Sequence, residues 1–190
     1  WFSGRNFRIG ASTVLSRAET LRRLPGLRAE GLRGSVLYYD GQFDDSRLNV
    51  ALIRTAVQHG ALAVNHLNVT GLLHEDGQVA GAQFRDAVTG AAGTVRARAV
   101  INATGPFVDE LRRLDEPGVE PLLTASSGTH IVLKGDLLTG ESGMLIPKTD
   151  DGRVLFMLPW HGHTLVGTTD NPAVAEAEPV APKDDIDYLL

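Results

Sequence analysis

Two segments in the first third of the chain combine a helical spacing of apolar residues with clear end signals. In residues 16–24, Ser16 can cap the first turn and Glu19 follows at the capping-box position. Pro25-Gly26 then ends the predicted helix. The string "GSVLYYDG" that follows lies between glycines and predicts a strand.

The second segment, "DDSRLNVALIRTAVQHG", has the clearest helical pattern of the chain. Asp44 or Asp45 can cap it, and Gly60 ends it. Its apolar positions are Leu48, Val50, Ala51, Leu52, Ile53, Ala56 and Val57. Because they cover more than one narrow stripe, the pattern predicts a largely buried helix. The apolar string "ALAVNH" after Gly60 predicts a short buried strand. A helix followed by a buried strand is half of the repeating unit of an α/β layer.

From residue 67 the apolar positions alternate instead, which is typical of strands. Asp76-Gly77 and Thr89-Gly90 interrupt the alternation and are hairpin signals. The pattern predicts a small antiparallel meander that ends in the apolar strand of "ARAVINATG". A short amphipathic helix over residues 107–114 follows, ended by Pro117-Gly118.

The last third of the chain predicts a second antiparallel region. Its strands are "GTHIVLKG", "GMLIPKT", "GRVLFMLPW" and "HTLVGTT", with turns at residues 150–153 and 161–163. After an exposed connector, "VAPKDDIDYLL" begins a helix, with Pro182 near its first turn and Asp184, Asp185 and Asp187 where negative charge suits the helix dipole. The chain stops there, so we expect it to be a piece of a longer protein.

Composition narrows the classes of protein. The chain has 190 residues, of which 43% are hydrophobic, as in folded globular proteins. A net charge of −5 without a dense basic block disfavours nucleic-acid binding. The absence of cysteine excludes disulfides and thiolate metal sites and agrees with a reducing compartment such as the cytoplasm.

Several strings could carry chemistry. In "VINATGP", a buried strand that ends at Ala103, Thr104 and Gly105 would bring backbone amides to the edge of a sheet where ligands bind, although a turn without a ligand fits equally well. His161-Gly162-His163 is a metal site only if a third ligand arrives from elsewhere, and otherwise a tight turn. His130 follows a Gly-Thr turn and opens a strand, which makes it a candidate site residue.

The usual phosphate-binding and hydrolase motifs are missing. The sequence contains neither G-x-G-x-x-G nor a P-loop, and no G-x-S-x-G nucleophile elbow. The residues alone therefore predict half of a cofactor-binding layer joined to an antiparallel module.

Four strings, taken in order, go further. "GSVLYYDGQFDDSRLNVAL", "INATGPFVDELRRL", "SSGTHIVL" and "IPKTDDGRVLFMLPWHGHTLVGTTD" resemble the FAD-dependent glycerol-3-phosphate dehydrogenase family. The chain departs from the common family pattern at Ser127, where Lys is usual, and at Phe107, where Trp is usual.

The resemblance implies a fold of mixed class, α/β plus α+β. A partial FAD-binding layer, Rossmann-like and of the glutathione-reductase type, would span residues 41–110. Residues 1–40 would lead, as a helix and a strand, into an antiparallel-sheet cap domain formed by residues 111–190 and truncated at its C-terminal end. The implied reaction is oxidation of sn-glycerol 3-phosphate to dihydroxyacetone phosphate by hydride transfer to FAD, with a quinone as electron acceptor. A homodimer and a cytoplasmic location, peripheral at the inner face of the cell membrane, are further expectations.

The resemblance also implies site residues. Val69, Ala103, Thr104 and Gly105 would lie on the cofactor side. The substrate side would take its residues from two cap-domain turns and one strand end: Thr129, His130, Trp160, Thr168, Thr169 and Asp170. It implies no metal, and it does not identify the catalytic base.

Other functions remain open at this stage. They are a glycerol-3-phosphate oxidase, a related FAD-dependent oxidoreductase acting on an amine or a 2-hydroxy acid, and a non-catalytic binding or interaction module. Because a flavin needs a phosphate-binding loop for its pyrophosphate, we expect the isolated chain to bind no FAD tightly and to be inactive.

Overall fold

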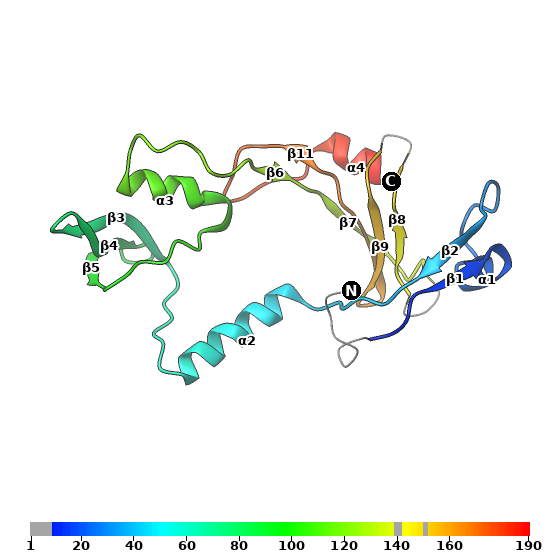
Figure 1. Ribbon diagram of the computed structural model, residues 1–190, viewed down its shortest axis with the longest axis horizontal. Helices are drawn as coiled ribbons and strands as arrows, with labels where there is room; N and C mark the ends of the chain where they lie inside the picture. Colours follow the sequence, from blue (N-terminus) through cyan, green and yellow to red (C-terminus); the bar gives the residue numbers. More distant parts are fainter. Residues whose placement is uncertain (1–8, 139–141, 150–151) are drawn as a thin grey trace. The chain divides into compact units, whose positions relative to one another are not determined.

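The structure is a computed structural model that describes residues 9–138, 142–149 and 152–190 (Figure 1). It divides into two compact units. The first, here called the sheet unit, comprises the described part of Trp1–Gln42 together with Ser126–Leu190. The second, the meander unit, comprises Phe43–Ala125. None of the described helices is long and apolar enough to cross a membrane.

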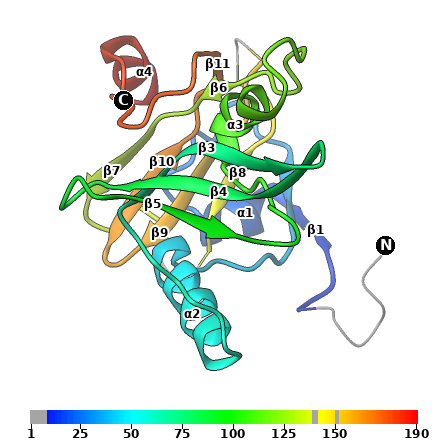
Figure 2. The ribbon, with the colours of Figure 1, turned by 90° about the vertical axis from the view of Figure 1, so that its left-hand side faces the viewer.

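The meander unit contains the predicted three-stranded sheet (Figure 2). Strands β3 (Leu67–Glu75), β4 (Gln78–Asp86) and β5 (Ala92–Arg96) pair antiparallel in that order. At the first turn, Asp76 and Gly77 both have positive φ, 51° and 75°. This is the requirement of a type I′ hairpin turn, so the Asp-Gly signal is confirmed. The Asp86 carboxylate accepts hydrogen bonds from the amides of Val88 and Thr89 and thereby closes the second turn.

Helix α2 (Asp45–Gln58) begins as predicted, because the Asp44 side chain accepts a hydrogen bond of 2.9 Å from the amide of Arg47. The predicted burial is wrong. None of its residues is buried, and Leu52 and Val50 are 61% and 55% exposed. Burial of a helix requires a layer to pack against, and no described strand packs along this one.

The two apolar strands predicted at 61–66 and 97–102 are also wrong. Leu62 and Ile101 are 91% and 88% exposed, and neither segment contains the strand that its residues favour. A strand forms only where a neighbouring strand hydrogen-bonds its backbone amides and carbonyls. Among the described residues, no strand pairs with either segment.

Helix α3 (Val108–Asp115) follows the short 3₁₀ turn η2 (Gly105–Phe107), close to the predicted range. Its buried Asp109 carboxylate accepts hydrogen bonds of 3.0 Å from the amides of Leu122 and Leu123, and one of 2.6 Å from Arg112. These bonds, the backbone amides first, lower the pKa of Asp109 to about 2. The carboxylate therefore holds the chain that leaves the helix against its first turn.

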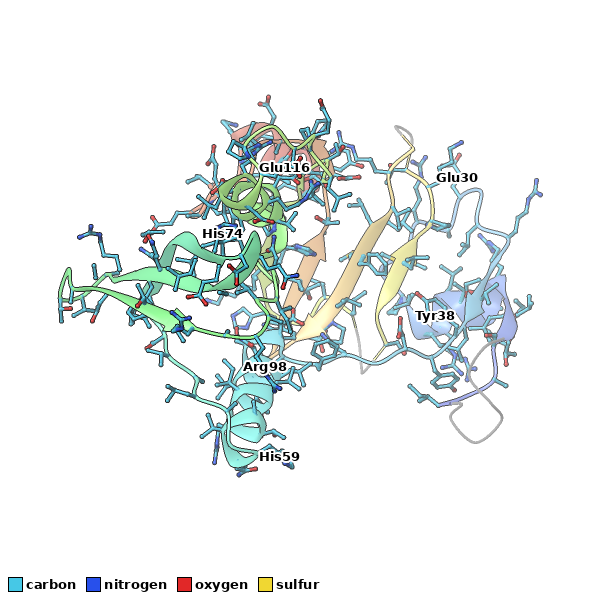
Figure 3. The ribbon with its side chains drawn as sticks, turned by 60° about the vertical axis from the view of Figure 1, so that its left-hand side comes forward. Glu30, Tyr38, His59, His74, Arg98 and Glu116 are labelled. Carbon is cyan, nitrogen blue, oxygen red and sulfur yellow. The ribbon has the colours of Figure 1, made fainter. Side chains whose placement is uncertain are left out.

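His74 joins the sheet of the meander unit to this helix. Its Nε2 lies 2.7 Å from Oδ1 of Asp115, so a residue of β3 pairs with the last residue of α3 (Figure 3). The sequence alone does not predict this contact, because His74 and Asp115 are 41 positions apart along the chain.

The sheet unit contains a four-stranded antiparallel sheet in the order β7-β10-β9-β8. Its strands are β7 (His130–Lys134), β8 (Met144–Ile146), β9 (Leu155–Trp160) and β10 (His163–Gly167), which confirms the predicted region. His161 and Gly162, with φ of 48° and 75°, form a type I′ turn between β9 and β10. Asp150 and Asp151 of the other predicted turn lie outside the described residues. Two-residue strands β6 (Ser126–Ser127) and β11 (Asn171–Pro172) pair beside the sheet.

One face of this sheet is covered and the other is open. On the covered face, Thr164 and Val166 of β10 are 0% and 5% exposed. Thr164 accepts a hydrogen bond of 2.9 Å from the amide of Leu137 and donates one of 3.0 Å to the carbonyl of Gly135. Helix α4 (Lys183–Leu189) packs against β7 with Leu189 buried. On the open face, Val132 is 56% exposed, so this face is accessible in the sheet unit.

A separate hairpin lies at the start of the described chain. Strands β1 (Thr13–Ser16) and β2 (Gly34–Leu37) pair antiparallel around α1 (Arg17–Arg23). The predicted capping box is present, because the Ser16 side chain accepts from the Glu19 amide and the Glu19 carboxylate accepts from the Ser16 amide.

Candidate functional site

The open face of the sheet unit contains a pocket of about 210 Å³ beside His130. The other lining residues come from the two neighbouring strands: Phe156 and Leu158 of β9, and Leu165 and Gly167 of β10. The strand register explains this grouping, because Gly167 pairs with both His130 and Phe156. The pocket therefore combines apolar walls with one imidazole, whose ring nitrogens can donate or accept a hydrogen bond.

Gly167 makes room for the imidazole. A Cβ at this position would lie 2.4 Å from Cδ2 of His130, closer than two non-bonded carbon atoms can approach. The absence of a side chain at Gly167 is therefore what allows the His130 ring to lie over β10 and reach the pocket.

Trp160 lies on the same face as His130 but at the other end of the strands. It pairs with His163, whereas His130 is level with Phe156. Four residues separate the two levels along β9, a distance of roughly 13 Å. The Trp160 ring instead packs edge-on against His161, with ring centroids 4.8 Å apart. The structure thus does not bring these two predicted substrate-side residues together.

The predicted residues Thr129 and Thr169 meet on the covered face. The amide of Thr129 donates a hydrogen bond of 2.9 Å to Oγ1 of Thr169. Both hydroxyls donate to Oδ2 of Asp185 in α4, over 2.8 Å from Thr129 and 2.7 Å from Thr169. Thr168 donates its hydroxyl to the Thr169 carbonyl, and Asp170 is exposed. These two turns therefore hold α4 on the sheet.

Asp185 is the residue of this cluster that the sequence did not single out. It is 5% exposed, and Asn171 donates a third hydrogen bond, of 2.8 Å, to its Oδ1. The bond from Thr169, more than any other contact, lowers the pKa of Asp185 and keeps the carboxylate ionised. The sequence does carry a signal for its burial: Asp185 precedes the apolar Leu189 by four residues, so both lie on one helix face.

The predicted cofactor-side residues lie in the meander unit. Ala103, Thr104 and Gly105 are exposed, and Val69 is 49% exposed next to a bulge in β3. Gly105 has φ of 57°, and a Cβ there would meet nothing within 4 Å, so the backbone is unobstructed at this position.

Asn102 holds this turn in place. Its Oδ1 accepts a hydrogen bond of 2.8 Å from the Thr104 hydroxyl, and its Nδ2 donates one of 2.9 Å to the carbonyl of Val108 in α3. Asn102 was not among the predicted site residues, although an Asn beside a turn commonly forms such local bonds.

The histidine turn carries no metal-binding arrangement in the described part of the chain. No group of three or more His, Asp or Glu side chains there could hold a metal ion. His163 Nδ1 lies 3.1 Å from the His161 carbonyl oxygen, within the type I′ turn itself.

Both the sequence and the fold of this chain are similar to those of known proteins. The sequence model of the FAD dependent oxidoreductase family matches residues 3–190. The chain belongs to this family.

Two relatives of this chain carry the name glycerol-3-phosphate dehydrogenase. A probable mitochondrial glycerol-3-phosphate dehydrogenase of Dictyostelium discoideum is 46% identical over 96% of this chain, which spans 30% of that protein. The mitochondrial glycerol-3-phosphate dehydrogenase of Rattus norvegicus is 42% identical over 95% of this chain, which spans 26% of it. The chain thus spans less than a third of the length of these relatives.

Solved structures agree with the fold. The glycerol-3-phosphate dehydrogenase from Bacillus halodurans, complexed with FAD, matches 93% of this chain with a TM-score of 0.85 and 34% identity, and the chain covers 36% of it. A glycine oxidase from Bacillus cereus matches 94% of this chain and 46% of its own with a TM-score of 0.70, but at 17% identity this likeness shows the fold alone. The predicted fold class, a partial FAD-binding layer with an antiparallel-sheet module, is confirmed.

Proposed function

We propose that this chain is part of an FAD-dependent glycerol-3-phosphate dehydrogenase. The observation that carries the proposal is the 46% identity over 96% of the chain with a protein of that name. The chemistry that FAD would supply when bound is hydride acceptance: in the oxidation of glycerol 3-phosphate to dihydroxyacetone phosphate the hydride would leave C2 for the flavin, the proton of the C2 hydroxyl would pass to a base, and the electrons would go on to a quinone.

Residues of the meander unit would hold the flavin. The exposed turn of Ala103, Thr104 and Gly105 offers backbone without a side chain in the way, and Asn102 keeps that turn in one conformation. Val69 would contribute its exposed edge of β3. We assign the flavin-binding role to residues 41–110, which overlap the meander unit, and the cap role to residues 1–40 and 111–190.

The open face of the sheet unit is the proposed substrate side. Its apolar pocket would contact the carbon atoms of a small polyol, while His130 can donate or accept one hydrogen bond at the substrate. Trp160 borders the same face farther along the strands. We place Thr129, Thr168, Thr169 and Asp170 behind this face, as support for the turns that lead into it.

A flavin-bleaching experiment tests the proposed function. The enzyme, purified with its flavin from its natural gene, should lose its flavin absorbance when glycerol 3-phosphate is added without oxygen. Glycerol, glycine and L-proline at equal concentration are the controls and should leave the absorbance unchanged. Bleaching by an amino acid but not by glycerol 3-phosphate would instead assign the chain to an amine or amino-acid oxidoreductase.

The acceptor, the assembly and the location are proposals that rest on the same function. We propose a quinone acceptor, a homodimer, and a cytoplasmic enzyme held peripherally at the inner face of the cell membrane. A soluble quinone should then reoxidise the reduced flavin faster than air does. Rapid reoxidation by oxygen with formation of hydrogen peroxide would identify an oxidase, and sedimentation of the purified enzyme tests the dimer.

A further inference from the structure

The carboxylate of Asp185 joins one helix to two turns of the sheet unit. It accepts hydrogen bonds from Thr129, which precedes β7, and from Thr169 and Asn171, which follow β10. All three bonds are between 2.7 and 2.8 Å long, and the carboxylate is buried. A charged group with three donors in a buried position keeps its partners in fixed places, because any displacement leaves it unsatisfied.

This cluster lies next to His130. Thr129 donates its amide to Thr169 and its hydroxyl to Asp185, while Thr169 donates its own hydroxyl to the same oxygen of Asp185. The three residues therefore form a closed ring of hydrogen bonds. His130 is the next residue after Thr129 and directs its ring to the opposite face, into the pocket.

The two turns are closely packed between the ring of hydrogen bonds and the imidazole of His130. A Cβ at Gly128 would lie 2.5 Å from Oγ1 of Thr168 and 2.8 Å from the carbonyl oxygen of Thr169. On the pocket side, the His130 ring lies as closely over Gly167. A change in the backbone of Thr129 would consequently be passed to the imidazole rather than absorbed within the turns.

We propose that Asp185 is a positioning residue for His130: through Thr129 and Thr169 it sets the place of the imidazole in the substrate pocket. This inference rests on the proposed function, because it assumes that His130 meets the substrate. It assigns to the Gly-Thr-His and Gly-Thr-Thr-Asp turns a shared role, in which Thr129 and Thr169 contact the helix and not the ligand.

Loss of the Asp185 carboxylate should not detach α4. Farther along this helix, Tyr188 donates its hydroxyl to Thr149 over 3.2 Å, and the Arg153 guanidinium lies 4.1 Å from the centre of the Tyr188 ring. Leu189 is buried as well. Asp185→Asn, which keeps the shape of the side chain, should therefore give a folded protein with a displaced His130.

A double-mutant cycle in the flavin-loaded enzyme tests the proposal. Asp185→Asn should lower kcat/KM for glycerol 3-phosphate by about 10- to 100-fold, since small displacements of a positioned group have effects of that size. In a His130→Gln background the same substitution should change kcat/KM by less than about 2-fold, because the group on which it acts is already gone. Equal effects in both backgrounds would overturn the proposal.

Three further variants test the specificity of the result. Asp184→Asn removes a neighbouring exposed Asp of the same helix and should leave kcat/KM unchanged. Thr169→Val removes one donor of the ring and should reproduce part of the loss, whereas Thr169→Ser keeps the hydroxyl and should restore it. If Asp185→Asn does not fold, Thr169→Val and Thr169→Ser can each be compared in enzyme with His130 and in enzyme with His130→Gln. The proposal then stands or falls by the same comparison of kcat/KM.

A spectroscopic measurement separates this proposal from the proposed function. In enzyme labelled at histidine, the His130 ring resonance, identified by its loss in His130→Gln, should shift in Asp185→Asn, while that of His74 in the meander unit should not. A shifted His130 resonance in an enzyme that glycerol 3-phosphate does not reduce would overturn the proposed function and leave the positioning role standing. An unshifted resonance would overturn the positioning role whatever the substrate.

Discussion

Thr164→Val provides a direct test of how the covered face of the sheet is held together. The Thr164 side chain is 0% exposed, and its hydroxyl both accepts from the amide of Leu137 and donates to the carbonyl of Gly135. Valine has nearly the same shape, so the substitution opens no cavity and removes only the hydroxyl. It leaves a backbone amide and a carbonyl without their partner inside the protein.

An unsatisfied buried donor costs about 1–3 kcal/mol, so we expect Thr164→Val to lower the free energy of unfolding by about 2 kcal/mol. For a domain of this size that corresponds to a fall in Tm of about 4–8 °C. Urea-induced unfolding followed by circular dichroism measures the change.

The matched control is Thr55→Val on the exposed helix α2. Its hydroxyl also donates a hydrogen bond, to the carbonyl of Ala51, but water can replace it there. We expect a change within about 0.5 kcal/mol for this control. If Thr164→Val costs no more than Thr55→Val, the hydroxyl does not stabilise the covered face and the reasoning is refuted.

Three other predictions concern residues of the meander unit, and the control for one of them, Gly26→Ala, lies in the sheet unit. The lowered pKa of Asp109 means that its contribution to stability is fully present above its ordinary pKa of 3.8 and is lost as the pH falls through about 2; Asp109→Asn should abolish this acid dependence and speed amide exchange in the segment after α3. Gly77→Ala places a side chain at φ of 75° and should cost about 1–2 kcal/mol in thermal unfolding, whereas Gly26→Ala, with open space and no positive φ, should cost much less. His74→Ala removes the half-exposed contact between His74 and the Asp115 carboxylate and should cost less than about 1 kcal/mol in thermal unfolding; a larger loss would show that packing of the ring also stabilises the unit.

Local signals in the sequence predicted the local structure well. The Ser16 capping box, the Asp76-Gly77 hairpin and the His161-Gly162 turn all form, because each depends on residues only a few positions apart. The order of the antiparallel strands along the chain followed from these turns and from the alternation between them.

The features that the sequence mispredicted depend on distant partners. The apolar side chains of α2 and the strands favoured at 61–66 and 97–102 require a packing layer or a neighbouring strand, and a pattern within one segment does not show whether either is present. The same holds for the site. Thr129 and Thr169 were placed on the substrate side from the resemblance, but the hydrogen bonds that hold them to Asp185 depend on a helix far along the chain.

The alternation of side chains across β7 has a consequence for how this region can vary. Thr129 and His130 are neighbours that face opposite sides of one sheet, one toward Asp185 and the other toward the pocket. Moving the chain by one position along β10 would exchange them, which would bury an imidazole against α4 and put a hydroxyl in the pocket. Insertions and deletions directly before β7 should therefore be selected against, even where the loop surface is exposed. In the exposed connector over residues 173–182, by contrast, changes of length shift no such pair.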